Sequence, residues 1–162
     1  MKKVAIVMGS DSDLPVARAA KDILTKLGIM GELFIYSAHR TPDEAAEFAK
    51  TAEDKGYQVI IGIAGMAAHL SGVLASQTIL PVIGVPCDSG SVRGLDALLA
   101  TVQMPPGIPV ATVGINNGKN AGLLAAEILA GQDQLIADKL RSFRQEQREA
   151  VLAKAKLLNG ED

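Results

Sequence analysis

The sequence has little of what marks several broad classes of protein. It contains one cysteine and no tryptophan, and its 16 basic and 18 acidic residues give a formal net charge of −2. A single cysteine, Cys87, cannot form an internal disulfide or a cysteine metal cluster, and this favours a reducing compartment. The balanced charge argues against a nucleic-acid-binding surface. We therefore expect a cytoplasmic protein that does not bind nucleic acid.

Long apolar segments are missing as well. The hydrophobic run Val4–Met8 is too short for the core of a signal peptide. The uncharged stretch Tyr57–Cys87 is broken by polar residues, by Pro81 and by several glycines, so we expect no membrane-spanning helix. Because 48% of the 162 residues are hydrophobic, the chain can bury a core, and we expect one catalytic domain over residues 1–162.

Short β-branched runs alternate with longer segments of helical periodicity. Strands are expected at Val4–Met8, Leu33–Tyr36, Val59–Ile63, Val82–Val85 and Val110–Val113, and helices at Ser12–Leu27, Thr41–Lys55, Ala67–Gln77, Leu95–Gln103 and Ala121–Leu129. Continuously apolar strands that alternate with helices indicate a parallel sheet covered on both faces. The predicted fold is α/β, a three-layer flavodoxin-like sandwich with a parallel sheet of about five strands.

The last segment, residues 133–159, predicts a long amphipathic C-terminal helix with no strand after it. It is equally compatible with a helix that folds back on its own domain and with an arm that packs on another subunit. The middle of the chain favours a homo-oligomer, because a small monomer must expose one face of each outer helix. Only five charged residues lie between Tyr57 and Gly131: Asp88, Arg93, Asp96, Lys119 and Glu127.

Candidate site residues follow the predicted strands. Ligands of open parallel sheets bind outside the carboxyl ends of the strands, and both histidines, His39 and His69, lie in or beside loops at those ends. An imidazole can shuttle a proton near neutral pH. Arg40 and the helix start at Thr41-Pro42, where Glu44 completes a capping-box pattern, can hold a phosphate or carboxylate. Taken alone, His39 could equally be a loop histidine, Arg40 a surface ion-pair residue and His69 a packing residue.

A second polar loop, Gly9–Asp13, follows the first strand. The Ser10 hydroxyl and the backbone N–H groups can approach a ligand, and its carboxylates can accept hydrogen bonds from ribose hydroxyls or an amine. Helix capping by Ser or Asp would explain the same residues. Asp88–Ser91, after the fourth strand, could cover the site or be an ordinary turn.

Several motifs occur together and in one order along the chain. They are Val7-Met8-Gly9-Ser10-Asp11-Ser12-Asp13, Ser37-Ala38-His39-Arg40-Thr41-Pro42-Asp43, Ala67-Ala68-His69-Leu70, Pro81-Val82-Ile83-Gly84-Val85-Pro86 and Val102-Gln103-Met104-Pro105-Pro106-Gly107-Ile108-Pro109-Val110. In these motifs the chain resembles the 5-(carboxyamino)imidazole ribonucleotide mutase family, also called the catalytic subunit of phosphoribosylaminoimidazole carboxylase. The resemblance covers at least residues 4–130.

The resemblance implies a purine-biosynthesis isomerase that uses no metal or cofactor. Such an enzyme moves a carboxylate from the exocyclic nitrogen of its substrate to a ring carbon, with His39 as a proton shuttle. It further implies that Asp13 binds the ribose and Arg40 the phosphate, and that the chain forms a homo-octamer. The full set of implied substrate-binding residues is Ser10, Asp13, Ser37, Ala38, Arg40, Gly65, Ala68, His69 and Leu70.

The chain departs from the family pattern at a few positions, and rival functions remain. Met66 stands where the family often has glycine, Ser71 where it often has proline, and Cys87–Ser91 differs from the common versions. The nearest rival is the sister class, which carboxylates aminoimidazole ribonucleotide directly with carbon dioxide. A signalling receiver would need an aspartate at the end of the third strand, and a flavin carrier would need stacking aromatic residues. The chain has Ile63-Ala64-Gly65 at that strand end and only two tyrosines.

Overall fold

The computed structural model describes residues 1–160, so residues 161 and 162 of the predicted domain lie outside the described part. Five parallel strands form one sheet in the order β2-β1-β3-β4-β5. The strands are β1 (Lys3–Met8), β2 (Met30–Ile35), β3 (Tyr57–Gly65), β4 (Val82–Cys87) and β5 (Ala111–Thr112). The helices are the short 3-10 turn η1 (Asp11–Asp13), α1 (Leu14–Lys26), α2 (Pro42–Thr51), α3 (Leu70–Ala75), α4 (Leu95–Val102), α5 (Gly118–Ala130) and α6 (Gln134–Asn159).

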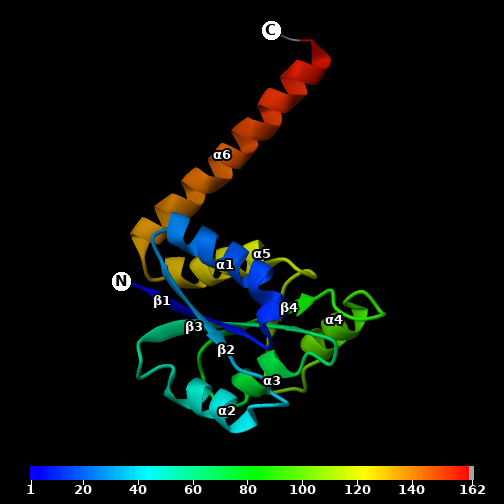
Figure 1. The fold of residues 1–162 in the computed structure, drawn as a ribbon. Coiled ribbons are helices and arrows are strands. Elements are labelled where there is room, and N and C mark those ends of the chain that lie inside the picture. Colours follow the sequence, from blue (N-terminus) through cyan, green and yellow to red (C-terminus); the bar gives the residue numbers. More distant parts are fainter. Residues whose placement is uncertain (161–162) are drawn as a thin grey trace.

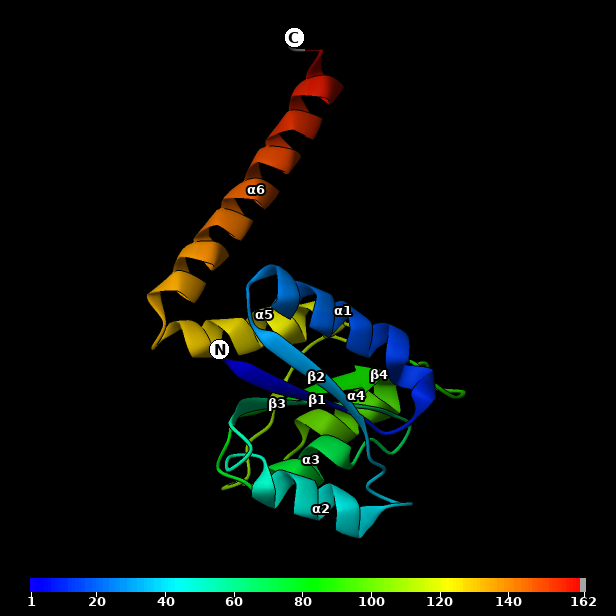
Figure 2. The same cartoon turned by 60° about the vertical axis from the view of Figure 1, so that its left-hand side comes forward.

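Helices cover both faces of the sheet, which confirms the predicted three-layer sandwich. Figures 1 and 2 show α1 and α5 on one face and α2 and α3 on the other. Alternate residues of β1 supply the two cores, because successive side chains of a strand point to opposite faces. Val4, Ile6 and Met8 pack with α1, α5 and the start of α6. Ala5 and Val7 pack with α2, α3 and α4.

The helix predicted from Ala67 is much shorter than expected. Its helical part, α3, begins only at Leu70, because Met66 has a left-handed backbone (φ 54°) that interrupts the chain after β3. Tight turns follow, with hydrogen bonds from Ala68 N to Met66 O (2.9 Å) and from His69 N to Ala67 O (2.7 Å). The segment Met66–His69 is therefore a loop at the carboxyl end of β3, and the side chains of Met66, Ala67 and His69 are exposed there.

Small residues let α3 lie close to the sheet. The buried Ser71 hydroxyl donates a hydrogen bond to Gly62 O (3.0 Å). A Cβ atom added to Gly62 would stand 2.7 Å from the Ser71 oxygen, and one added to Gly84 would stand 3.2 Å from it. The departure from the family pattern at Ser71 thus has a structural role, since its hydroxyl binds a strand carbonyl next to two glycines.

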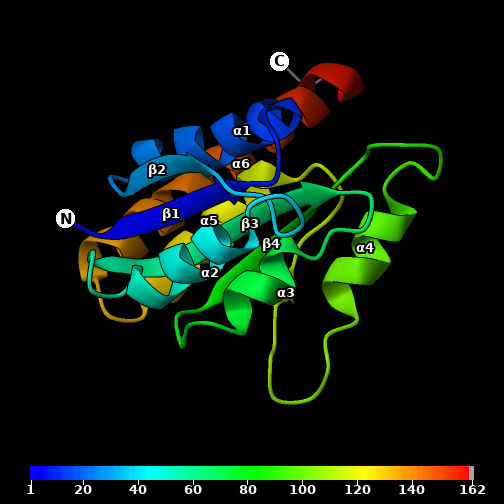
Figure 3. The same cartoon turned by 60° about the horizontal axis from the view of Figure 1, so that its bottom comes forward.

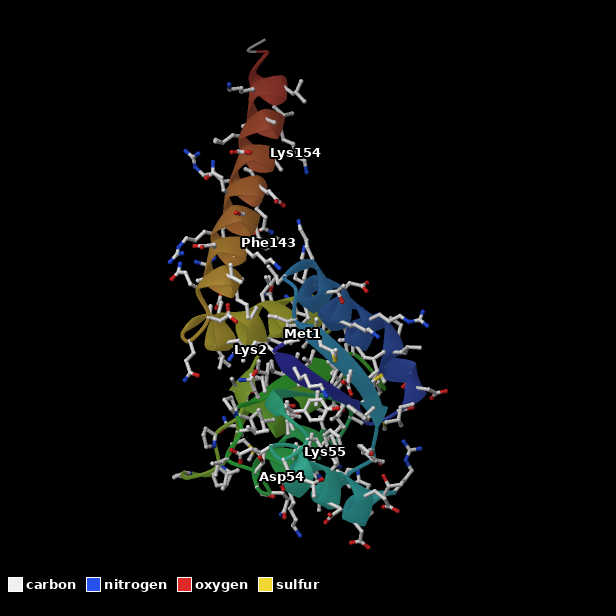
Figure 4. The ribbon with its side chains drawn as sticks, turned by 90° about the vertical axis from the view of Figure 1, so that its left-hand side faces the viewer. Met1, Lys2, Asp54, Lys55, Phe143 and Lys154 are labelled. Carbon is white, nitrogen blue, oxygen red and sulfur yellow. The ribbon has the colours of Figure 1, made fainter. Side chains whose placement is uncertain are left out.

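The fold-back interpretation of the C-terminal helix describes the start of α6, while packing on another subunit stays a prediction for the rest. Its first turns fold back on the domain, where Ile136, Leu140 and Phe143 are buried in the core beneath α1 and α5. From Arg144 to Leu158 every side chain is exposed, and the helix projects away from the body (Figures 1 and 4). Figure 4 places Phe143 at the root of this projection and Lys154 far along it.

Within residues 1–160, no helix combines the length and the apolar character needed to cross a membrane.

Figure 3 shows α4 at one side of the molecule, next to β4 and apart from α1. The strand β5 at this edge has two residues, shorter than the four predicted.

Candidate active site

The loops at the carboxyl ends of β1, β2, β3 and β4 enclose one cavity of about 510 Å³. A cavity of this size suits a small-molecule ligand. Its lining residues are Gly9, Ser10, Ser12, Asp13, Ser37, Ala38, His39, Arg40, Ala64, Gly65, Met66, Ala67, His69, Leu70 and Ser89. The position agrees with the rule that parallel α/β sheets bind ligands at this end of their strands.

The two histidines, which lie 30 residues apart in the sequence, meet in the cavity. His39 Nε2 and His69 Nδ1 are 2.9 Å apart, and the rings stand edge to face with centroids 5.0 Å apart. This hydrogen bond needs an N–H on one ring and a lone pair on the other. The pair therefore carries at most one positive charge while the bond is present, and one ring can hold a proton beside a neutral neighbour.

Arg40 is held in the wall of the cavity by the loop that precedes α2. Its guanidinium donates to Gly9 O (3.1 Å) and to the Ser37 hydroxyl (3.3 Å), and its backbone N–H also donates to that hydroxyl (3.1 Å). Because Ser37 Oγ accepts both bonds, its own proton remains available to a ligand. Arg40 and Ser37 thus offer a cation and a hydroxyl donor side by side.

Thr41 stabilises the same loop rather than capping α2 through its side chain. It is the N-cap residue, with Pro42 in the first turn as predicted, but its hydroxyl accepts from Ser37 N (2.8 Å) and donates to Ser37 O (3.2 Å). The predicted capping box with Glu44 is wrong in this respect. The threonine hydroxyl fixes the turn that carries His39 and Arg40.

Asp13 is the buried acid of the site, with 7% of its surface exposed. Burial raises the pKa of its carboxyl group, although hydrogen bonds from the Cys87 thiol and from the Ser10 backbone oppose the shift. Burial beside Asp13 in turn raises the pKa of the Cys87 thiol to about 12, so this thiol stays protonated and donates. Asp13 therefore presents an acceptor, at the start of α1, to hydroxyl or amine donors of a ligand.

The loop after β4 closes one side of the cavity. The Ser89 side chain occupies the space in which a Cβ atom of Gly65 would stand, so Gly65 permits this approach. Met66, on the same β3 loop, lies against Gly90, with its Cγ 3.7 Å from the position of a Cβ there. Asn116 holds the base of the loop, since its side-chain oxygen accepts a hydrogen bond from Asp88 N (2.8 Å).

The structure brings together nine of the ten predicted site residues in one cavity. These are Ser10, Asp13, Ser37, Ala38, His39, Arg40, Gly65, His69 and Leu70. Ala68 is instead buried in the core between the sheet and α3, and it does not line the cavity. Six further lining residues were not among those predicted: Gly9, Ser12, Ala64, Met66, Ala67 and Ser89. All six lie in loops that follow predicted strands, which is the same signal that indicated the other nine. Among residues 1–160, no three His, Cys, Asp or Glu side chains converge as metal ligands.

Comparison with known proteins gives consistent results along the chain. The family model described as AIR carboxylase matches residues 3–150. A relative from Thermotoga maritima, named N5-carboxyaminoimidazole ribonucleotide mutase, is 54% identical over 158 residues, which are 98% of this chain and 92% of the relative. A Pyrococcus horikoshii relative of the same name is 56% identical over 155 residues, 96% of this chain and 88% of the relative. A crystal structure of Treponema denticola PurE superposes with a TM-score of 0.89 at 32% identity, covering 98% of this chain and 99% of that one.

Proposed function

The chain belongs to the AIR carboxylase family, and we propose that it acts in purine biosynthesis as a mutase. The reaction converts 5-(carboxyamino)imidazole ribonucleotide into 4-carboxy-5-aminoimidazole ribonucleotide without a cofactor. The observation that carries this proposal is the similarity, over nearly the whole chain, to relatives that bear the mutase name. The sister activity is direct carboxylation of aminoimidazole ribonucleotide with carbon dioxide. It has less support because these relatives are named for the mutase reaction.

His39 is the proposed proton shuttle, and it begins the cycle as an imidazolium. It gives its proton to the exocyclic nitrogen as the bond from that nitrogen to the carboxylate carbon breaks. The bonding electrons stay on the nitrogen, and carbon dioxide is released within the cavity. Ring carbon C4 then attacks carbon dioxide, and His39 removes the proton from C4, which restores both the aromatic ring and the imidazolium. One imidazole suffices because the proton that it gives is replaced by the one that it takes.

His69 is proposed to support the shuttle by position. Its Nδ1 lies 2.9 Å from His39 Nε2, so it fixes the orientation of the His39 ring. As long as this hydrogen bond forms, a protonated His39 faces a neutral His69, which keeps the two rings from repelling each other. The reaction itself requires only one of the two rings to exchange a proton with substrate.

The remaining site residues are proposed to bind the phosphate, the ribose and the imidazole base of the ribonucleotide. Arg40 and the free Ser37 proton suit the phosphate, since a guanidinium and a hydroxyl both donate to phosphate oxygens. The buried Asp13 carboxylate suits the ribose hydroxyls, with Ser10 beside it. The proposed wall for the imidazole base is made by Ala38, Gly65, His69 and Leu70, while Ala68 supports this wall from the core.

We further propose that the chain works as a homo-oligomer in the cytoplasm, and specifically as an octamer. Two apolar surfaces support self-association. Val92, Leu95, Leu99 and Val102 form a row of half-exposed side chains on and just before α4, at a spacing of three, four and three residues that suits helix packing. The projecting part of α6 carries a second apolar row that includes Val151 and Leu158.

Both rows lack an apolar partner within the described residues of one chain. Charged residues flank the α6 row, and Arg144, seven residues before Val151, already pairs with Glu127 at 2.6 Å. A second copy supplies the same kind of apolar surface without burying an unpaired charge. The octameric number rests on the family resemblance, whereas the existence of an interface rests on these two rows.

The activity is tested by supplying purified protein with 5-(carboxyamino)imidazole ribonucleotide in bicarbonate-free buffer. We expect product to form at the full rate without added carbon dioxide. A strict requirement for added carbon dioxide, together with activity on aminoimidazole ribonucleotide, would instead establish the sister reaction.

A further inference from the structure

Met66 combines three features that neither the fold nor the proposed chemistry requires of it. Its backbone is left-handed at φ 54°, a conformation that residues other than glycine rarely adopt. Its side chain is 60% exposed although it is large and apolar. It also lines the mouth of the cavity and lies against Gly90 on the opposite loop. Strained residues of this kind cluster at ligand clamps and switch regions.

The left-handed turn at Met66 sets the direction of its side chain. The turn is closed by the hydrogen bond from Ala68 N to Met66 O and leads directly to His69. The β3 loop therefore aims one side chain, that of Met66, across the mouth while it places His69 inside. Ser89, packed on Gly65, joins the same two loops nearby. A side chain at position 66 thus spans the gap between the β3 loop and the β4 loop.

The proposed reaction releases carbon dioxide inside the cavity, and an apolar side chain across the mouth would help to retain it. Carbon dioxide is small, uncharged and apolar, so hydrogen-bonding groups hold it weakly and it is retained mainly by walls. In the described part of the chain, Met66 and Leu70 are the two large apolar side chains that line the cavity, and of these Leu70 is buried whereas Met66 is exposed. A thioether side chain has three rotatable bonds beyond Cα and adapts its shape to the bound ligand.

We propose that Met66 is a retention residue, which covers the mouth of the cavity so that carbon dioxide recombines with the ring before it escapes. The inference rests on the proposed mutase function. It assigns to Met66 no proton transfer and no contact with the phosphate or ribose. A turnover in which retention fails releases one molecule of carbon dioxide and leaves one molecule of aminoimidazole ribonucleotide.

The test uses substrate that carries ¹³C in its migrating carboxylate. Single turnovers are run with enzyme in excess, in buffer that contains unlabelled bicarbonate and carbonic anhydrase to dilute any carbon dioxide that escapes. Mass spectrometry then gives the fraction of product that keeps the label, and chromatography gives the aminoimidazole ribonucleotide released. Met66→Ala keeps the Cβ atom, and with it the strain of the left-handed backbone, but removes the side chain that covers the cavity. Met66→Leu keeps the Cβ atom and most of the side-chain volume.

We expect wild type and Met66→Leu to retain most of the label, and Met66→Ala to lose a several-fold larger share, with a matching rise in aminoimidazole ribonucleotide. Equal retention in Met66→Ala and wild type would overturn the retention role and leave the mutase function standing. A wild type that forms product only from the unlabelled pool would instead contradict the mutase function itself. A structural role alone would alter folding or rate equally for all turnovers and leave the retained fraction unchanged.

Discussion

The buried acid of the site gives a prediction in which stability and activity move in opposite directions. Asp13 is 7% exposed, and desolvation by burial is the largest influence on its carboxyl group, whose pKa it raises. At neutral pH the folded protein without substrate therefore holds a charge that the unfolded chain would hydrate better. Asp13→Asn keeps the shape and removes the charge. We expect it to stabilise the fold by up to about 1 kcal/mol, which for a chain of this size raises Tm by roughly 2–4 °C.

The sign of the pH dependence follows from the raised pKa. Because the folded state binds the Asp13 proton more tightly than the unfolded chain, wild type gains relative stability as pH falls through the folded pKa. Asparagine mimics the protonated acid at every pH. The stability difference between Asp13→Asn and wild type is therefore present at neutral pH and closes in acid, below the unfolded carboxyl value of 3.8.

The same substitution weakens substrate binding. A hydrogen bond to a charged acceptor contributes about 1.5–3 kcal/mol, so exchanging the carboxylate for an amide lowers kcat/KM by roughly one to two orders of magnitude. Thermal unfolding and steady-state kinetics are measured at one fixed protein concentration, because the proposed self-association would stabilise the fold by mass action. Asp11→Asn is the matched control, since Asp11 lies in the same turn but is exposed. A less stable Asp13→Asn at neutral pH, or an unchanged kcat/KM, would refute the reasoning.

Two further predictions concern packing and assembly. Ser71→Ala removes the hydroxyl that donates to Gly62 O, and we expect it to lower the free energy of unfolding by about 0.5–1.5 kcal/mol in chemical denaturation, because a buried hydrogen bond is lost. An unchanged midpoint would show that this bond contributes nothing. Val151→Glu places a charge on the apolar row of the projecting helix, where Val151 is 66% exposed, and we expect sedimentation to show weaker assembly. The control Ala153→Glu puts the same charge on the opposite face of that helix, and equal effects of the two would contradict the α6 interface.

The sheet, and the location of the site at the carboxyl ends of its strands, were predictable from the sequence. The predicted strands are continuously apolar, and each is followed by a polar or glycine-containing loop. That pattern alone places His39 and His69 at the same edge of the sheet, and the structure confirms that they meet. The family resemblance added the reaction. Neither source indicated that the two rings would be in direct hydrogen-bond contact, because such contact depends on how the β2 and β3 loops fold locally.

The structure differs from the predicted helix starts where backbone geometry overrides local propensity. The apolar stretch after Gly65 has helical periodicity, yet the left-handed Met66 delays α3 until Leu70. Thr41 has the right neighbours for a capping box, but its hydroxyl binds Ser37 instead. In both places the altered geometry serves the loops of the site rather than the helix that follows.

The central claim is that His39 exchanges the proton in a carboxylate transfer, and His39→Asn tests it most directly. The variant is to be compared with wild type for turnover of 5-(carboxyamino)imidazole ribonucleotide and, separately, for its affinity for the product by calorimetry. We predict intact folding and near-normal affinity with turnover reduced by roughly two to four orders of magnitude. His69→Asn, which removes only the supporting ring, should lose no more than about tenfold. Near-normal turnover in His39→Asn would contradict the account.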